Sequence, residues 1–365
     1  MAKPLSASDR LLIVRLGAIG DVLRTLPAVH LIRTTFPKVH IAWLVEALSH
    51  DLLRGHPEID ELILFDRRAF GESRGTIGLA RHLGDVARDL RARRFGVVAD
   101  FQGTFKSALL ARLTGAPLRF GFAPGHCREM SFLLSNRWVR PQGRRLNRVD
   151  KNLSMADALG ARGDSIVMTL PESPEEARAA ETLLLKVAPQ GQAVVLMSAG
   201  TSRRQSHKRW PAGSYARVAS LLRARLDAVP LICWGPGEES LAREVQAASN
   251  GLALIAPAIP LRELAALLRR SALFIGADTG PMHLAWGVGC PVVALFGPTD
   301  PALNGPLGRP HAVLMGGGST ARIPSEAVFD AAQRLLAQRT PVASRQSPLR
   351  LPRHTAASTA SQSRL

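Results

Sequence analysis

Cysteine is scarce in this sequence. Only Cys127, Cys233 and Cys290 are present among 365 residues, and no two of them form a CxxC pair. Zinc modules and disulfide-stabilised secreted domains depend on clustered or paired cysteines, so the sequence argues against both classes. We expect the three thiols to be reduced and buried.

Long apolar runs are missing as well. No stretch of about 18 uncharged apolar residues occurs, so no transmembrane helix is expected. The first ten residues, MAKPLSASDR, lack the apolar core of a signal peptide, and Arg15 interrupts the short run from Leu11 to Leu16. We therefore expect a cytoplasmic protein. A hydrophobic content of 46% is still ample for about two folded domains.

Acidic and aromatic residues are also in short supply. The 47 Lys and Arg residues outnumber the 29 Asp and Glu residues, giving a net charge of +18, and aromatic residues make up only 5%. This charge favours an anionic partner, such as nucleic acid, an anionic membrane face or a phosphorylated substrate. The aromatic residues do not interleave with the arginines as base stacking would require, which disfavours nucleic acid. The scattered arginines could equally be solvated surface residues; their densest runs are Arg88–Arg94 and Arg137–Arg148.

Short apolar runs alternate with segments of helical periodicity. The predicted strands are residues 11–16, 39–45, 62–65, 95–99 and 118–121, and then, after a change of composition at 160–190, residues 193–197, 229–234, 272–275 and 291–296. Such alternation is typical of a doubly wound parallel sheet, and its restart indicates two of them. We place the domains at 1–170 and 171–340. The remaining residues, 341–365, contain no acid and are predicted to be a disordered basic tail.

A glycine turn follows the first predicted strand. It reads GAIGD and leads into a predicted helix over residues 22–34, with Asp21 at the junction. Its glycines do not form G-x-G-x-x-G, so a dinucleotide fingerprint is weak. Asp21 can be interpreted as a helix N-cap or as a general base at the mouth of a cleft.

A second glycine turn, GADTGP, follows the predicted strand 272–275. Thr279 is a candidate N-cap there, and Pro281 suits the first turn of a short helix over 282–288. Asp278 lies at the carboxyl end of the strand, where open α/β sheets bind ligands, and a helix N-terminus attracts phosphate. His283 is one turn into this helix and is either a ligand contact or a core histidine.

Three stretches in this order resemble glycosyltransferase family 9, the ADP-heptose:lipopolysaccharide heptosyltransferases. They are LLIVRLGAIGDVLRTLPAVHLIRTTFPKVHIAWLV from residue 11, SHKRWP at 206–211, which is similar to the family's K-x-W-P element, and GADTGPMHLAWGVGCPVVALFGPTDP from residue 276. The resemblance covers about residues 11–335. It implies the GT-B fold, in which two Rossmann-like domains face a central cleft, the first binding the acceptor and the second the nucleotide sugar.

The resemblance also assigns site residues. Asp21 matches the catalytic aspartate, and either Glu238 or Glu239 falls where the family often has an acid near the ribose. The matched donor-site residues are Lys208, which would contact phosphate, and Asp278, Thr279, Gly280 and His283. The residues that could meet an anionic acceptor are Arg128, Arg144, Arg145 and Arg148. The loop between Gly200 and Lys208 is longer than usual for the family, and Ala199 stands where a proline is common.

The implied reaction is an inverting, direct displacement without a metal or a bound cofactor. Heptose would pass from ADP-heptose to Kdo–lipid A or inner-core lipopolysaccharide, with the enzyme attached peripherally to the inner leaflet of the inner membrane and binding no nucleic acid. A lysine and helix N–H groups can stabilise the charge on a leaving diphosphate, and the sequence has no D-x-D motif or His/Asp cluster.

Three alternatives remain open. The first is a family 9 transferase with another nucleotide sugar or acceptor, which the motifs cannot separate from a heptosyltransferase. The second is a non-enzymatic protein that binds polyanions or membranes through its charge. The third is an NAD-dependent oxidoreductase, which the missing G-x-G-x-x-G disfavours.

Overall fold

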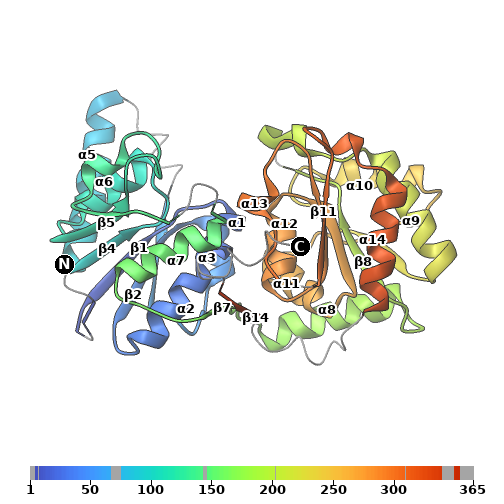
Figure 1. Cartoon of the computed structure of the whole chain (residues 1–365), viewed down its shortest axis with the longest axis horizontal. Coiled ribbons are helices and arrows are strands. Elements are labelled where there is room, and N and C mark those ends of the chain that lie inside the picture. Colours follow the sequence, from blue (N-terminus) through green and yellow to red (C-terminus); the bar gives the residue numbers. More distant parts are fainter. Residues whose placement is uncertain are drawn as a thin grey trace, which may run out of the picture. The chain divides into compact units, whose positions relative to one another are not determined.

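The computed structural model describes residues 5–6, 8–66, 75–142, 146–201, 203–308, 310–338 and 349–353. The chain divides into two compact units, Met1–Pro171 with Arg350–Leu365, and Glu172–Leu349. Within each unit a six-stranded parallel sheet is covered by helices on both faces (Figure 1). None of the helices in the described part of the chain combines the length and the apolar character of a membrane span.

The first unit has the strand order β3-β2-β1-β4-β5-β6. Its strands are β1 (Arg10–Val14), β2 (His40–Glu46), β3 (Glu61–Phe65), β4 (Val97–Asp100), β5 (Leu118–Phe122) and β6 (Arg137–Val139). Its helices are α1 (Ile19–Leu23), α2 (Leu26–Thr35), α3 (Ala47–Leu53), α5 (Gly75–Ala92), α6 (Phe105–Leu113) and α7 (Arg148–Ala158), with a 3-10 turn, η1 (Ser131–Leu134). The central strand β1 is buried from Leu11 to Val14, as a parallel strand covered on both faces requires.

The second unit has the strand order β10-β9-β8-β11-β12-β13. Its strands are β8 (Val194–Ser198), β9 (Val229–Ile232), β10 (Leu254–Ile255), β11 (Leu273–Ala277), β12 (Val292–Phe296) and β13 (His311–Met315). Its helices are α8 (Pro174–Val187), α9 (Ala212–Leu226), α10 (Glu239–Ala248), α11 (Leu261–Arg270), α12 (Gly280–Gly287), α13 (Pro301–Asn304) and α14 (Ser325–Ala337), with 3-10 turns η2 (Arg203–Lys208) and η3 (Thr320–Arg322).

Both sheets follow the order 3-2-1-4-5-6 when their strands are counted within each unit. The order reverses between β1 and β4 in the first unit and between β8 and β11 in the second. Loops leave these neighbouring strands in opposite directions, and the crevice between them is where doubly wound sheets bind ligands. The fold therefore predicts one ligand region for each unit.

Two expectations from the sequence are corrected here. The helix expected over 22–34 is two helices, because α2 restarts at Leu26 with Pro27 in its first turn, where the missing proline N–H breaks no hydrogen bond. The expected basic tail contains a strand, β14 (Leu349–Pro352), which pairs with β7 (Ser165–Met168). The pairing is secured by Arg353, whose guanidinium lies 2.9 Å and 2.5 Å from the two carboxylate oxygens of Asp157.

The cysteines are unpaired, and Cys233 and Cys290 are buried as expected. Cys127 is only half-buried, because it lies in the loop after β5 rather than in a strand. The rest of the expected tail, residues 341–348 and 354–365, lies outside the described residues.

Candidate functional site

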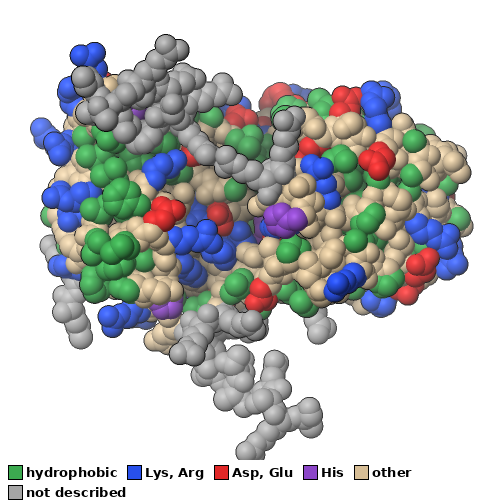
Figure 2. Space-filling view, turned by 90° about the horizontal axis from the view of Figure 1, so that it is seen from above, with side chains coloured by type: hydrophobic (Ala, Val, Ile, Leu, Met, Phe, Trp, Pro, Cys, Tyr) green, Lys and Arg blue, Asp and Glu red, His purple; other side chains and the backbone are tan. Residues whose placement is uncertain are grey.

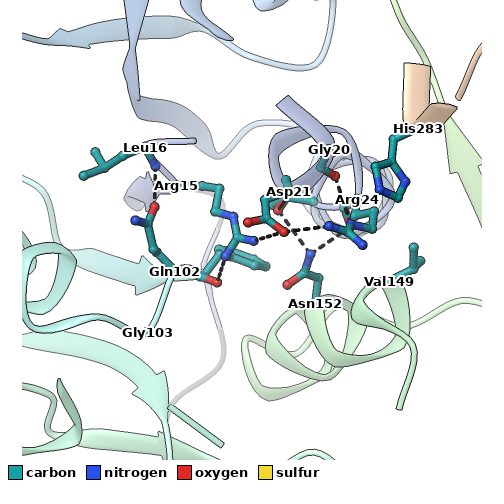
Figure 3. Close-up of polar contacts among 12 residues, drawn as sticks. Arg15, Leu16, Gly20, Asp21, Arg24, Gln102, Gly103, Val149, Asn152 and His283 are labelled. Carbon is teal, nitrogen blue, oxygen red and sulfur yellow. Dashed lines mark hydrogen bonds and ion pairs between the residues drawn. The ribbon is translucent and has the colours of Figure 1, made fainter. Parts of the chain in front are cut away.

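In the first unit, hydrogen bonds join the loops that follow β1 and β4. The Arg15 guanidinium donates to the Phe101 carbonyl oxygen at 2.6 Å, and the Leu16 N–H donates to Gln102 Oε1 at 2.9 Å. Figure 3 shows both contacts. The loop after β4 is itself held by buried Asp100, which accepts from the Gln102 and Gly103 N–H groups at 2.9 and 3.0 Å. The switch point between β1 and β4 is thus a fixed polar framework.

Asp21 lies against this framework. Its Oδ1 is 2.9 Å from Arg15 Nη2 and 2.8 Å from Arg24 Nη2, so the carboxylate sits between two guanidinium groups (Figure 3). Both arginines are buried, whereas the Asp21 side chain keeps 31% of its surface exposed. The N-cap interpretation is wrong, because the N-cap of α1 is Ala18 and Asp21 is in the first helical turn. In the structure the Asp21 carboxylate is instead neutralised by two buried arginines on its inner side and is partly exposed to solvent on its outer side.

Helix α7 supports the same region. Asn152 Nδ2 donates to the Arg24 carbonyl oxygen at 2.8 Å and to Thr25 Oγ1 at 3.1 Å. The Thr25 hydroxyl donates in turn to the Asp21 carbonyl oxygen at 2.9 Å. The corner between α1 and α2 is therefore fixed by side chains from a third helix, which holds Asp21 in place.

Positive charge gathers on this side of the first unit. Lys151 of α7 donates to the His126 carbonyl oxygen at 2.5 Å and lies over the Phe122 ring, 4.2 Å from its centre. Burial, together with the charges of Arg148, Arg15 and Arg128, lowers the pKa of Lys151 to about 8. The charges of the predicted acceptor residues Arg128 and Arg148 therefore act on the same lysine as that of Arg15, which pairs with Asp21. The other two predicted acceptor residues, Arg144 and Arg145, lie outside the described residues.

In the second unit, three predicted donor residues meet at the switch point. Asp278 follows β11, and Lys208 ends the turn η2 that follows β8. Lys208 Nζ lies 3.0 Å from Asp278 Oδ2 and 3.1 Å from the Asp278 carbonyl oxygen, and His283 Nε2 lies 3.1 Å from Asp278 Oδ1. All three side chains are buried. Burial by itself would raise the pKa of Asp278, but the hydrogen bond and charge of His283 and the charge of Lys208 outweigh it and hold that pKa well below its usual value.

The sequence SHKRWP explains how Lys208 is positioned. Trp210 is buried, donates to the Ile323 carbonyl oxygen at 3.1 Å and packs edge-on against Tyr215, with ring centres 4.8 Å apart. Tyr215 in turn donates to the Ser198 carbonyl oxygen at the end of β8, at 2.7 Å. The tryptophan thus anchors the loop, so that a lysine two residues earlier can reach Asp278.

The start of α12 adds backbone groups to this region. Thr279 is the N-cap residue, but its hydroxyl donates to the Ala277 carbonyl oxygen at 3.2 Å and makes no side-chain cap. Gly280 begins the helix and Pro281 follows it. The first-turn N–H groups are therefore not capped by Thr279, and they carry the partial positive charge of the helix end.

The two candidate glutamates differ sharply. Glu238 turns inward: its Oε2 accepts from the Gly235 N–H at 3.0 Å, and a Cβ atom on Gly200 would overlap its carboxylate. Glu239 is on α10 and pairs with Arg243 across one helical turn, at 2.6 Å. Only Glu238 lies at the carboxyl ends of β8 and β9, so it is the better candidate for a ligand contact.

A family model described as glycosyltransferase family 9 (heptosyltransferase) matches residues 83–323 of this chain. The chain belongs to glycosyltransferase family 9. Membership confirms the resemblance drawn from the three motifs. It also confirms an enzyme of the transferase class over a protein that only binds through charge, and over an oxidoreductase.

Named relatives of this family 9 transferase extend over nearly its whole length. It is 25% identical over 350 residues to lipopolysaccharide heptosyltransferase 3 of Escherichia coli (strain K12), covering 90% of this chain and 99% of the relative. It is 28% identical over 313 residues to lipopolysaccharide heptosyltransferase 1 of Pseudomonas aeruginosa, covering 82% of each.

Solved structures confirm the fold. A family 9 glycosyltransferase from Veillonella parvula superposes with a TM-score of 0.77 at 23% identity, covering 91% of this chain and 98% of that one. The E. coli heptosyltransferase WaaC with ADP gives a TM-score of 0.72 at 24% identity, covering 89% of this chain and 99% of that one. The two doubly wound units are thus the two domains of the GT-B fold.

Sequence reasoning missed two members of the Asp21 group. Arg15 was treated only as an interruption of an apolar run, although a charged residue at the carboxyl end of a central strand is itself a sign of a site. Arg24 has the i,i+3 spacing from Asp21 that brings helix side chains together. Among the residues that the structure describes, no group of three or more His, Cys, Asp or Glu is arranged to hold a metal ion.

Proposed function

We propose that this family 9 transferase moves heptose from ADP-heptose to the Kdo or inner-core region of lipopolysaccharide, by an inverting displacement that needs no metal or cofactor. The proposal rests foremost on Asp21, a partly exposed carboxylate at the switch point of the first unit. The names of the relatives, which are lipopolysaccharide heptosyltransferases, support the sugar and the acceptor class. The acceptor is membrane-anchored, so the enzyme would work at the inner leaflet of the inner membrane as a peripheral protein.

In the proposed reaction, Asp21 acts as the general base. It takes the proton of the acceptor hydroxyl while that oxygen forms a bond to the anomeric carbon of the heptose. The bond between this carbon and the phosphate oxygen breaks, ADP leaves with the electron pair, and the configuration inverts. Arg15 and Arg24 hold one oxygen of the carboxylate and so fix its orientation.

Lys208 and the start of α12 would stabilise the diphosphate. Within the described residues, Asp278 accepts from Lys208 Nζ through its side chain and its carbonyl oxygen, which leaves one of the three ammonium hydrogens for a phosphate oxygen. Both oxygens of the Asp278 carboxylate are engaged, by Lys208 and His283, so we assign Asp278 a positioning role. Preorganised positive charge of this kind stabilises the negative charge that develops on the leaving diphosphate in the transition state.

The deciding experiment is transfer with purified full-length protein. ADP-heptose is tested against Kdo₂–lipid A and its mono-heptosylated form, with UDP- and GDP-sugars as competing donors and with EDTA added to half of the reactions. Turnover of ADP-heptose that EDTA does not reduce, with an inverted anomeric product, is the expected result. Consumption of another nucleotide sugar instead would overturn the donor, and loss of activity in EDTA would overturn metal independence.

The adjacent glutamates Glu238 and Glu239 provide a second test. We expect Glu238→Gln to raise the KM for the donor by about tenfold or more, because a hydrogen bond to a charged group contributes roughly 1.5–3 kcal/mol. The neighbouring substitution Glu239→Gln removes the same charge from the helix surface and serves as the matched control. Equal effects of the two substitutions on donor KM would show that Glu238 does not contact the nucleotide sugar.

A further inference from the structure

The first unit exposes a group of large apolar side chains close together in sequence. Phe105, Met130, Leu133 and Trp138 keep 50%, 61%, 62% and 51% of their surface exposed. In the described part of the chain, Phe105 and Trp138 are the two aromatic residues among the exposed large hydrophobic side chains. On the face seen in Figure 2, the first unit (left) shows hydrophobic side chains gathered beside Lys and Arg side chains. We call these four residues the apolar patch.

Hydrogen bonds and ring packing connect the elements that carry the patch. The Phe105 N–H, at the start of α6, donates to the Glu129 carboxylate at 3.1 Å, next to Met130. Phe132, the neighbour of Leu133 in η1, packs edge-on against Trp138 of β6 with ring centres 5.9 Å apart. These contacts hold the start of α6 against the turn that precedes η1, and η1 against the edge strand β6, so the elements that carry the patch are neighbours.

The details of the patch suit an apolar environment. The Trp138 ring N–H donates to the Phe132 carbonyl oxygen at 3.0 Å, so the indole can leave water without losing its hydrogen bond. Glu129 and Met130 have φ angles of 54° and 53°, in the left-handed region that costs energy for residues other than glycine.

The surroundings of the patch are strongly basic. Residues 101–149 contain nine Lys and Arg residues and a single acid, Glu129. Burial and the charge of Arg112 lower the pKa of Arg119. The Arg119 guanidinium donates to the carbonyl oxygens of Ala116 and Leu134, at 2.7 and 3.2 Å, and these neutral groups leave its charge unbalanced. Within the described residues no carboxylate pairs with Arg112, Arg119 or Arg137, whereas elsewhere in the unit arginines do pair, as in Arg10–Glu61, Arg33–Asp60 and Arg88–Asp85.

We propose that the apolar patch and the arginines Arg112, Arg119 and Arg137 form a surface that docks the first unit onto an anionic phospholipid bilayer. Exposed Trp, Leu, Met and Phe side chains enter the interfacial region, while the three arginines, whose charges no described carboxylate balances, contact lipid phosphates. This inference rests on the proposed function, because a membrane-anchored acceptor requires the enzyme at the bilayer. The inference adds to the proposed function the surface that meets the bilayer and the kind of lipid that it binds.

Vesicle binding of the full-length protein tests the proposal. The vesicles contain either phosphatidylcholine alone or equal parts of phosphatidylethanolamine and phosphatidylglycerol. Of the five tryptophans, Trp43, Trp210 and Trp286 are buried and Trp234 is half-buried, so Trp138 is the one exposed reporter. We expect a blue shift of its emission, and quenching by brominated acyl chains, with the anionic vesicles only.

Variants identify the surface. The double variant Met130→Ser/Leu133→Ser and the double variant Arg112→Glu/Arg137→Glu are each expected to lower the vesicle partition coefficient by about tenfold. The matched control is Leu185→Ser, at an exposed leucine of α8 in the second unit, which should leave it unchanged. Equal loss in the control and the patch variants would overturn the proposal, as would unchanged binding of all variants. Loss of RNA binding in these variants with vesicle binding retained would also overturn it.

The acceptor form separates this inference from the proposed function. Patch variants should keep wild-type turnover on a water-soluble, deacylated acceptor and lose turnover on the same acceptor embedded in vesicles. A protein that binds anionic vesicles through the patch but does not use ADP-heptose would leave the docking surface standing and refute the proposed donor. A protein that transfers heptose from ADP-heptose, but whose vesicle binding is unchanged by the patch substitutions, would support the proposed donor and refute the docking surface.

Discussion

Replacing Asp21 by asparagine is expected to lower kcat by about 10²–10⁴-fold, the usual contribution of a general base. Asparagine keeps the shape of the side chain and one oxygen for Arg15 and Arg24, but it cannot take the proton of the acceptor hydroxyl. Because the donor residues belong to the other unit, the Kd for ADP should stay within about threefold of wild type. Steady-state kinetics and calorimetric titration with ADP measure the two quantities.

Stability must be separated from catalysis in this variant. Asp21 balances two buried guanidinium groups, so its loss also destabilises the first unit. The melting temperature and the circular dichroism of Asp21→Asn are therefore compared with those of Asp85→Asn, which removes a carboxylate from an exposed pair on α5. A folded Asp21→Asn protein with wild-type kcat would show that Asp21 only neutralises the two arginines.

The sequence predicted the fold well because its strands are central and buried. Runs such as Leu11–Val14 and Val292–Phe296 have no polar face, which is typical only of parallel sheets covered by helices on both sides. The break between α1 and α2 was also encoded, by Pro27, but helical periodicity continues across it and conceals it. Strand β14 could not be predicted, because its partner β7 is almost two hundred residues away and its flanking residues are those of a linker.

The site was predicted in part, and the limit is physical. Motifs indicated Asp21, Lys208 and Asp278, because turns after central strands end at the same edge of a sheet. Pairings between distant segments do not follow from spacing, and Arg15 with Phe101 or Lys151 with His126 are of this kind. The choice between Glu238 and Glu239 required the direction of each side chain. The sequence does not determine this direction, because it places the start of helix α10 only to within one residue.

The second large effect is expected at Asp278. In Asp278→Asn, Lys208 keeps its charge in a buried site without the opposing carboxylate, and breaking such a pair costs about 3–5 kcal/mol in the free energy of unfolding. Urea unfolding of the purified protein measures this loss. The substitution Glu326→Gln breaks the exposed pair with Arg217 in the same unit and should change stability far less.

A double variant then separates folding from function. In Lys208→Met/Asp278→Asn both charges are absent, so most of the lost stability should return, while donor binding stays weak because the phosphate contact is gone. Recovery of both stability and donor affinity would show that the pair has a structural role only.

The pH dependence of stability is an independent test of the same pair. Because the pKa of Asp278 is lower in the folded protein than in the unfolded chain, its carboxylate adds stability above about pH 4, and this stability is lost as the pH falls further. Wild type should therefore lose stability in acid more steeply than the double variant.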